Sequence, residues 1–153
     1  MPNPVAKEVC REIRLQKALF EHARLAAGQS VLIHGGAGGV GSLAVQLARW
    51  RSARVLATAS ARDKEFVRSL GADEVIDYRT TPFHEKLREI DVVLDTIGGE
   101  TLEHSWSVLR KGGVLVTLVS PIPTGVAEQR GVRGIFFIVR GNRAQLDQIT
   151  IGG

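Results

Sequence analysis

The sequence predicts a doubly wound α/β domain built on a mostly parallel, six-stranded sheet. Three observations support this fold class: short β-branched apolar runs recur, segments with helical apolar spacing alternate with them, and glycines follow several of those segments. Gly71, Gly112 and Gly113 stand just past predicted helices, where glycine accommodates a left-handed terminal residue. Strands and helices that alternate at this spacing imply right-handed crossovers and the strand order 3-2-1-4-5-6.

The elements are predicted in order along the chain. Residues 5–27 read as a basic amphipathic helix that leads into the domain, and residues 28–153 are assigned to the domain itself. The proline- and glycine-rich stretch 120–134 is expected to be a long loop, either a plain connection or part of a ligand site at the carboxyl end of a strand. Strands are predicted over residues 31–33, 54–58, 74–77, 92–95, 114–119 and 135–139, and helices from residue 40 and over 64–70, 83–89, 101–109 and 144–150.

Composition narrows the class of protein. The chain has 153 residues, 44% of them hydrophobic and 24% charged, which indicates one globular domain with its own core. Its one cysteine, Cys10, excludes an internal disulfide and a cysteine-rich zinc site, and it favours a reducing, cytoplasmic location. No segment reaches the ~18 apolar residues of a membrane span, and the N-terminus lacks the apolar core of a signal peptide. The net charge of +4 is spread thinly beside few aromatic residues, so no membrane partner and no nucleic-acid partner is expected.

A glycine-rich stretch, S-V-L-I-H-G-G-A-G-G-V-G-S over residues 30–42, joins the first predicted strand to the next helix. Gly36, Gly38 and Gly41 satisfy G-x-G-x-x-G, in which the first glycine makes a tight turn, the second lets backbone approach a pyrophosphate and the third lets helix and strand pack closely. The unpaired N–H groups and the dipole at the start of that helix favour an anion. Ser42 follows Gly41 where a P-loop has lysine, so nucleotide triphosphate hydrolysis is not expected. The stretch predicts a dinucleotide site, with a purely structural glycine turn as the alternative.

The segment about 20 residues past the glycines bears on the choice of cofactor. NAD sites place an acidic residue there, whereas this segment reads A-T-A-S-A-R-D-K over residues 57–64. Thr58 and Ser60 can donate hydrogen bonds, and Arg62 and Lys64 bring positive charge toward a 2′-phosphate. Asp63 could instead turn inward and favour NAD. The missing acid favours NADP, and it also disfavours S-adenosylmethionine as the ligand.

Three motifs together resemble a known family. They are A-L-F-E-H-A-R-L with V-L-I-H-G-G-A-G-G-V-G, then S-L-G-A-D-E-V-I-D-Y-R, and then D-V-V-L-D-T-I-G-G. Over residues 18–150 the chain resembles the cofactor half of medium-chain dehydrogenases/reductases, and within them the zinc-independent quinone oxidoreductases and NADPH-dependent enone reductases. The resemblance implies a Rossmann-type fold, NADPH as cofactor, no zinc, and hydride transfer to a quinone or an α,β-unsaturated carbonyl.

The resemblance also implies a set of cofactor contacts. Ala37 to Gly41 would hold the pyrophosphate, and Ser60, Arg62 and Lys64 would surround the 2′-phosphate. Tyr78 would lie near the adenosine. The full expected set is Gly36, Ala37, Gly38, Gly39, Val40, Gly41, Thr58, Ser60, Arg62, Lys64 and Tyr78, with Thr96 and Ile97 at the adenine and ribose, and Val119 and Ser120 near the nicotinamide.

No catalytic residue is predicted in this chain. The four histidines, His22, His34, His84 and His104, lie on separate elements without ligand spacing. The Tyr-x-x-x-Lys pair of short-chain dehydrogenases is absent, because the only tyrosine, Tyr78, is followed by R-T-T-P. Members of the resembled family are roughly twice as long and carry a β-rich substrate domain, which is expected to be absent here. A non-catalytic dinucleotide-binding module or a truncated fragment is therefore the alternative to a complete oxidoreductase.

The last predicted strand suggests a partner. Residues 135–139 are strongly apolar and are expected at a sheet edge, where unpaired backbone groups invite another strand. The resemblance implies that the same surface joins two subunits, so a homodimer through Ile135–Val139 is predicted.

Overall fold

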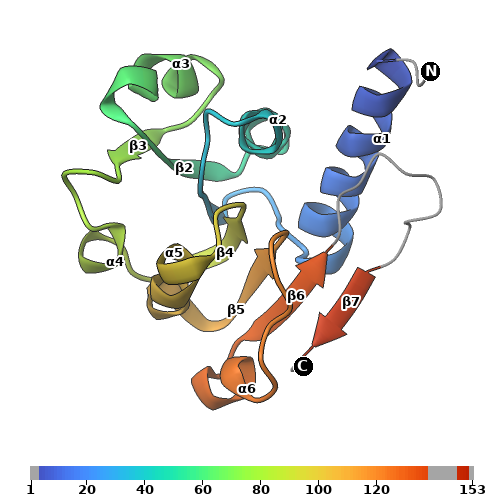
Figure 1. The fold of residues 1–153 in the computed structure, drawn as a ribbon, viewed down its shortest axis with the longest axis vertical. Helices are drawn as coiled ribbons and strands as arrows, with labels where there is room; N and C mark the ends of the chain where they lie inside the picture. The colour runs from blue at the N-terminus through green and yellow to red at the C-terminus, as the bar shows by residue number, and fades with distance from the viewer. Residues whose placement is uncertain (1–3, 138–147, 152–153) are drawn as a thin grey trace.

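The structure, a computed structural model, describes residues 4–137 and 148–151. Its centre is a seven-stranded sheet in the order β3-β2-β1-β4-β5-β6-β7 (Figure 1). The first six strands are parallel and keep the predicted order 3-2-1-4-5-6, which confirms the doubly wound α/β fold. The strands are β1 Ser30–Ile33, β2 Arg54–Ala59, β3 Glu74–Asp77, β4 Ile90–Asp95, β5 Leu109–Thr117, β6 Arg133–Phe137 and β7 Gln148–Ile151.

Helices cover both faces of the sheet, with α1, α2 and α3 on one side and α4, α5 and α6 on the other (Figure 1). Side chains alternate along each strand between the two layers, as in β1, where Val31 and Ile33 join one apolar cluster and Leu32 joins the other. The helices are α1 Pro4–Gln16, α2 Gly39–Trp50, α3 Lys64–Ser69, α4 Phe83–Lys86, α5 Gly99–Ser105 and α6 Val126–Arg130. A π-helix at Lys17–His22 extends α1. Short 3₁₀ helices precede α3, at Ala61–Asp63, and follow α5, at Trp106–Val108.

Several element boundaries differ from the sequence prediction. The first helix ends at His22 rather than residue 27, and α4 stops at Lys86 because Leu87 already has extended backbone angles. The predicted helix 101–109 ends before Leu109, which begins β5. The stretch 120–134 is not wholly a loop, because it contains α6 and the start of β6.

The C-terminal part holds the largest correction. A helix was expected over residues 144–150, but Gln148–Ile151 forms β7, antiparallel to β6, with Ile135 opposite Thr150. The run I-T-I is β-branched and therefore suits a strand better than a helix, and β6 offers it an unpaired edge. Residues 144–147, and positions 138–139 of the predicted last strand, lie outside the described residues. Residues 135–137 are thus an inner part of the sheet, with β7 at its edge.

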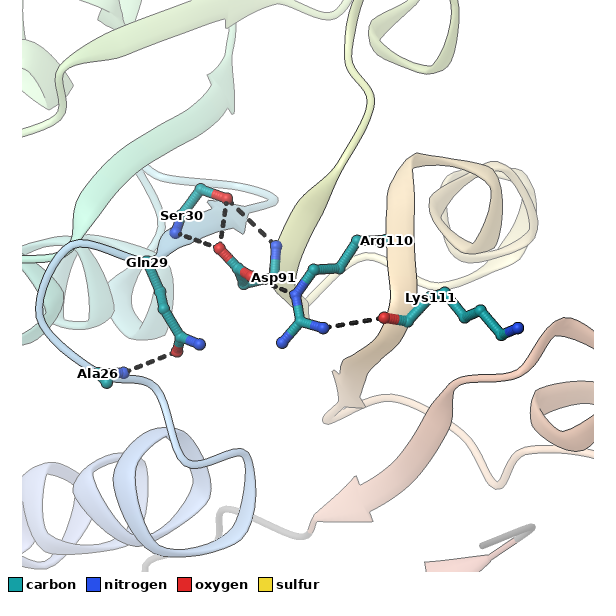
Figure 2. Close-up of polar contacts among 6 residues, drawn as sticks. All are labelled: Ala26, Gln29, Ser30, Asp91, Arg110 and Lys111. Carbon is teal, nitrogen blue, oxygen red and sulfur yellow. Dashed lines mark hydrogen bonds and ion pairs between the residues drawn. The ribbon is translucent and has the colours of Figure 1, made fainter.

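A polar brace ties together the amino ends of β1, β4 and β5, opposite the glycine-rich stretch (Figure 2). Asp91 Oδ2 accepts hydrogen bonds from Ser30 N at 2.9 Å and Ser30 Oγ at 3.2 Å, and Asp91 Oδ1 pairs with Arg110 Nε. Partial burial alone would raise the pKa of Asp91, but the hydrogen bonds from Ser30 and Arg110 outweigh it and hold this pKa below its ordinary value. The brace fixes the sheet end that faces away from the candidate site.

Candidate functional site

The glycine-rich turn runs from the carboxyl end of β1 into α2. Gly35 makes the turn at a φ of +70°, whereas Gly36, which was expected to make it, brings the backbone against Ala57 and Val67. A Cβ atom at Gly36 would lie 3.0 Å from both of those side chains. A Cβ atom at Gly41 would lie 2.0 Å from the Gly35 carbonyl oxygen, so Gly41 has the predicted role of letting helix and strand approach.

The amino end of α2 opens at this turn. Gly38 is the N-cap residue with extended backbone angles, and it has no side chain that could satisfy the helix's first N–H groups. The backbone N–H groups of Gly39, Val40 and Gly41 therefore have no intrahelical carbonyl to bind. The helix dipole adds roughly half a positive charge at this helix end. An oxyanion is stabilised at such a helix end.

His34, at the end of β1, is the centre of a buried hydrogen-bond chain. Ser105 Oγ donates to the Thr101 carbonyl at 2.6 Å, so it acts as acceptor toward His34 Nε2 at 2.8 Å. Nε2 therefore carries the proton, and Nδ1 accepts from Thr58 Oγ1 at 3.1 Å. Burial lowers the pKa of His34 to about 4, against an opposing pull from Asp95, so the ring is neutral near pH 7.

Thr58 is used differently from the sequence prediction. Its hydroxyl, expected to donate a hydrogen bond to the cofactor, binds His34 and also accepts from Gly35 N at 3.2 Å. Only 4% of Thr58 is exposed. Thr58 therefore holds the glycine turn against β2, and its hydroxyl proton is already used within the protein.

The carboxyl ends of β4 and β5 carry a second set of polar contacts. Asp95 is fully buried and accepts from Thr117 Oγ1 at 2.8 Å and from the backbone N–H groups of Ile97 and Gly98. Thr96 Oγ1 donates to the His34 carbonyl at 2.7 Å. This last bond crosses from β1 to β4, where the strand order reverses.

A cavity of about 360 Å³ opens between the glycine turn and the carboxyl ends of β1, β2 and β3. Six residues from the predicted cofactor set line it: Ala37, Gly38, Thr58, Ser60, Tyr78 and Ile97. Six further residues outside that set also line it: His34, Gly35, Ala59, Asp63, Phe83 and Thr101. The first four lie within or beside the segments already singled out in the sequence, whereas Phe83 and Thr101 are distant along the chain and gave no local signal.

An adjoining cavity of about 580 Å³ is lined by two arginines and two aspartates, Asp63 and Asp77, beside Ser60 and Tyr78. Arg62 lines it as predicted, and Arg79, which sequence reasoning did not assign, lines it as well. Asp63 borders both cavities and accepts from Ser60 Oγ at 3.2 Å. Lys64, Val119 and Ser120 line neither cavity.

The remaining histidines do not form a metal centre. The rings of His84 and His104 stack with centroids 3.8 Å apart, and His22 lies against Phe137. Within residues 4–137 and 148–151, no group of three or more His, Cys, Asp or Glu side chains is placed to hold a metal ion. None of the helices described is long and apolar enough to cross a membrane.

Known proteins share this sequence and fold. The sequence profile of a family described as zinc-binding dehydrogenases matches residues 39–140. A 2-haloacrylate reductase from a Burkholderia species is 38% identical over 87% of this chain and 45% of its own length, and a 2-methylene-furan-3-one reductase from Solanum lycopersicum is 38% identical over 86% and 32%. The crystal structure of Escherichia coli quinone oxidoreductase complexed with NADPH superposes with a TM-score of 0.76 at 25% identity, over 86% of this chain and 45% of that one.

The chain thus spans less than half the length of these relatives. The profile match nevertheless covers about two thirds of the chain. It begins at the first residue of α2, after β1 and the residues of the glycine turn that line the 360 Å³ cavity, and it includes the later elements through β6. On this sequence match and the shared fold, the chain belongs to the zinc-binding dehydrogenase family of medium-chain dehydrogenases/reductases, in its branch of quinone oxidoreductases and enone reductases.

Proposed function

We propose that this chain is the NADPH-binding domain of an oxidoreductase that transfers hydride to a quinone or an α,β-unsaturated carbonyl. The observation that carries the proposal is the open amino end of α2 beside the 360 Å³ cavity, at the carboxyl edge where the sheet order reverses. Doubly wound sheets bind dinucleotides at this edge. The tomato 2-methylene-furan-3-one reductase and the E. coli quinone oxidoreductase, to which this chain is similar, support the reaction class.

The residues present fit a dinucleotide. The backbone of residues 37–41 suits the pyrophosphate, and the cavity between Tyr78 and Ile97 suits the adenosine. Val119 and Ser120 follow β5, in the half of the sheet left for the nicotinamide. When bound, the cofactor supplies the hydride, so this chain needs only to bind and orient it. Accordingly, no catalytic residue is assigned.

The second cavity favours NADPH over NADH. Arg62 and Arg79 line it together with the hydroxyls of Ser60 and Tyr78, and Lys64 follows Asp63 in the chain. Asp63 and Asp77 are the opposing charges there; Asp63 accepts a hydrogen bond from Ser60 Oγ, and Asp77 accepts one from Arg79 N. Guanidinium groups are well suited to bind a phosphate in two-pronged geometry, and both carboxylates are already engaged within the protein.

Some expectations from the sequence remain part of the proposal. Zinc independence is tested by metal analysis of the purified protein, and a cytoplasmic location by cell fractionation. A homodimer through Ile135–Val139 is retained only with a condition: because β7 pairs with β6, such a dimer requires β7 to leave that edge. The alternative function, a non-catalytic dinucleotide-binding module or fragment, predicts cofactor binding without turnover of a simple quinone.

The decisive experiment is a paired titration with NADPH and NADH at fixed, moderate salt, followed by nicotinamide fluorescence. We expect NADPH to bind at least about tenfold more tightly, and Arg62→Ala to remove most of that preference, because one charge-assisted contact is worth about 1.4 kcal/mol or more. Arg68→Ala is the matched control, since Arg68 pairs with Glu65 on the exposed side of α3 and lines neither cavity. Equal binding of the two cofactors would refute the NADPH assignment, and binding of neither would refute the proposed function.

A further inference from the structure

Asp95 and Thr117 form a buried clasp between the carboxyl ends of β4 and β5. The two residues are direct partners in the strand register, and both are fully buried. Thr117 Oγ1 donates to Asp95 Oδ2 at 2.8 Å. This Asp95–Thr117 clasp lies outside the residues that line the two cavities.

Each member of the clasp also holds the loop that follows its own strand. Asp95 Oδ1 accepts from Ile97 N at 3.1 Å and Gly98 N at 3.0 Å. Thr117 Oγ1 accepts from Val119 N at 3.2 Å while it donates to Asp95. These bonds join the two side chains to each other and to the backbone N–H groups of the two loops. Their effect is to fix where two loops stand relative to one another.

The two loops carry apolar side chains to the surface at the same edge. Ile97 is 54% exposed and Val119 is 46% exposed. Gly98 lies between them at a φ of +79°, and a Cβ atom there would meet Val119 Cγ1 at 2.8 Å. The backbone of Gly98 therefore packs directly against Val119, and the spacing of the two loops depends on the clasp beneath them.

The sheet topology indicates what this edge contacts. In a doubly wound sheet, each half of the sheet binds one nucleotide half of the ligand, and the two halves meet where the strand order reverses. The 360 Å³ cavity is built mainly on β1, β2 and β3, so it takes the adenosine half. Resting on the function proposed above, we infer that the Asp95–Thr117 clasp is a positioning pair: through Thr117 it sets the nicotinamide half of the cofactor on Val119, and through Asp95 it joins that loop to Ile97 at the adenosine cavity.

Two ligands separate this role from a general effect on folding. NADPH contains both halves, whereas adenosine 2′,5′-bisphosphate contains only the adenosine half with its 2′-phosphate. The ratio of the two dissociation constants measures how much the nicotinamide half adds to the affinity.

Four variants test the clasp. Thr117→Val removes the hydroxyl at nearly constant volume, and Thr117→Ser keeps it. Asp95→Asn retains one acceptor oxygen for the loop N–H groups but replaces the other with a donor. Val93→Ala, in the buried core of β4, is the control for a loss of stability alone.

We expect Thr117→Val to weaken NADPH binding about tenfold, the effect of losing one or two buried hydrogen bonds, while the binding of adenosine 2′,5′-bisphosphate changes less than about twofold. Asp95→Asn should weaken the binding of both ligands, because Asp95 also holds Ile97, which lines the 360 Å³ cavity. Thr117→Ser should restore the wild-type ratio, and Val93→Ala should leave the ratio unchanged even where thermal unfolding shows a similar loss of stability. A ratio that is the same in wild type and Thr117→Val would overturn the inference and leave the proposed function standing. Wild-type protein that binds neither ligand would overturn both.

Discussion

His34 carries its proton on Nε2 because every neighbouring hydroxyl is already committed to one direction of hydrogen bonding. A second proton has to go to Nδ1, where it would face the Thr58 hydroxyl proton, so this hydroxyl, which also accepts from Gly35 N, would have to rotate. Residue-level chemistry therefore links the charge of one buried ring to the glycine turn. His34 was predicted only to lack a catalytic or metal-binding role, because the spacing of its hydrogen-bond partners Thr58 and Ser105 along the chain forms no recognisable motif.

We predict that this histidine makes the protein less stable as the pH falls from about 6.5 to about 4. The unfolded chain takes up the proton at the ordinary histidine pKa, while the folded chain, with the pKa of His34 lowered to about 4, does not. The free energy of unfolding should fall by up to about 3 kcal/mol over this range, since each pKa unit corresponds to about 1.4 kcal/mol. Urea unfolding at a series of pH values measures the slope.

The control for this prediction is His34→Asn. Its amide oxygen can still accept from Thr58, but the side chain does not titrate, so the variant should lose most of the slope between pH 6.5 and 4 even if it is less stable throughout. An unchanged slope in the variant would show that other groups cause the acid sensitivity.

At the scale of the elements, the close packing of α2 against the end of β1 depends on the absence of a side chain at Gly41. We predict that Gly41→Ala destabilises the protein by more than about 2 kcal/mol, because the new Cβ would sit 2.0 Å from a backbone oxygen that cannot move without opening the turn. Gly39→Ala is the matched control two residues earlier in the same helix. Its nearest neighbour would be Arg11 Nη1 at 3.5 Å, and alanine favours the helix, so stability should be unchanged or slightly higher. Chemical denaturation of both variants tests the contrast, and equal destabilisation would contradict it.

The elements that the sequence predicted best are those with a local signal. The six parallel strands are short apolar runs between glycine or charged turns, and each was found within a few residues of its predicted position. The C-terminal strand could not be predicted in this way, because Gln148–Ile151 takes its conformation from pairing with β6, a contact between segments. Tertiary pairing there overrides a helical pattern.

The same limit applies to the candidate site. The glycine turn and Arg62 could be found because their motif and spacing are local. Arg79 and Phe83 line the cavities only because β3 and the loop that follows it lie beside β2. The Thr58 hydroxyl faces inward, where it donates a hydrogen bond to His34 Nδ1. Long-range packing decided which side of each strand end faces a ligand.

At the scale of the whole molecule, β7 controls whether the sheet can grow. An uncovered β6 would present a row of unpaired backbone groups beside an apolar face, which invites a second copy. We predict that pairing of β6 with β7 and pairing of β6 with another chain exclude each other, so that self-association through β6 appears only when β7 is displaced.

Two adjacent proline substitutions test this competition. In an antiparallel pair, neighbouring residues direct their N–H groups to opposite sides, so only one of Ile149 and Thr150 donates toward β6. Proline at that position removes a ladder bond and clashes with β6, whereas proline at the other position faces away from the sheet and is tolerated at an edge. Sedimentation velocity over a hundredfold range of protein concentration should show a monomer for wild type and for the variant whose proline faces away from β6. The variant whose proline replaces the N–H group that donates to β6 should form concentration-dependent dimers. If wild type and both variants sediment as the same concentration-independent dimer, the subunits associate elsewhere and β7 has no part in it.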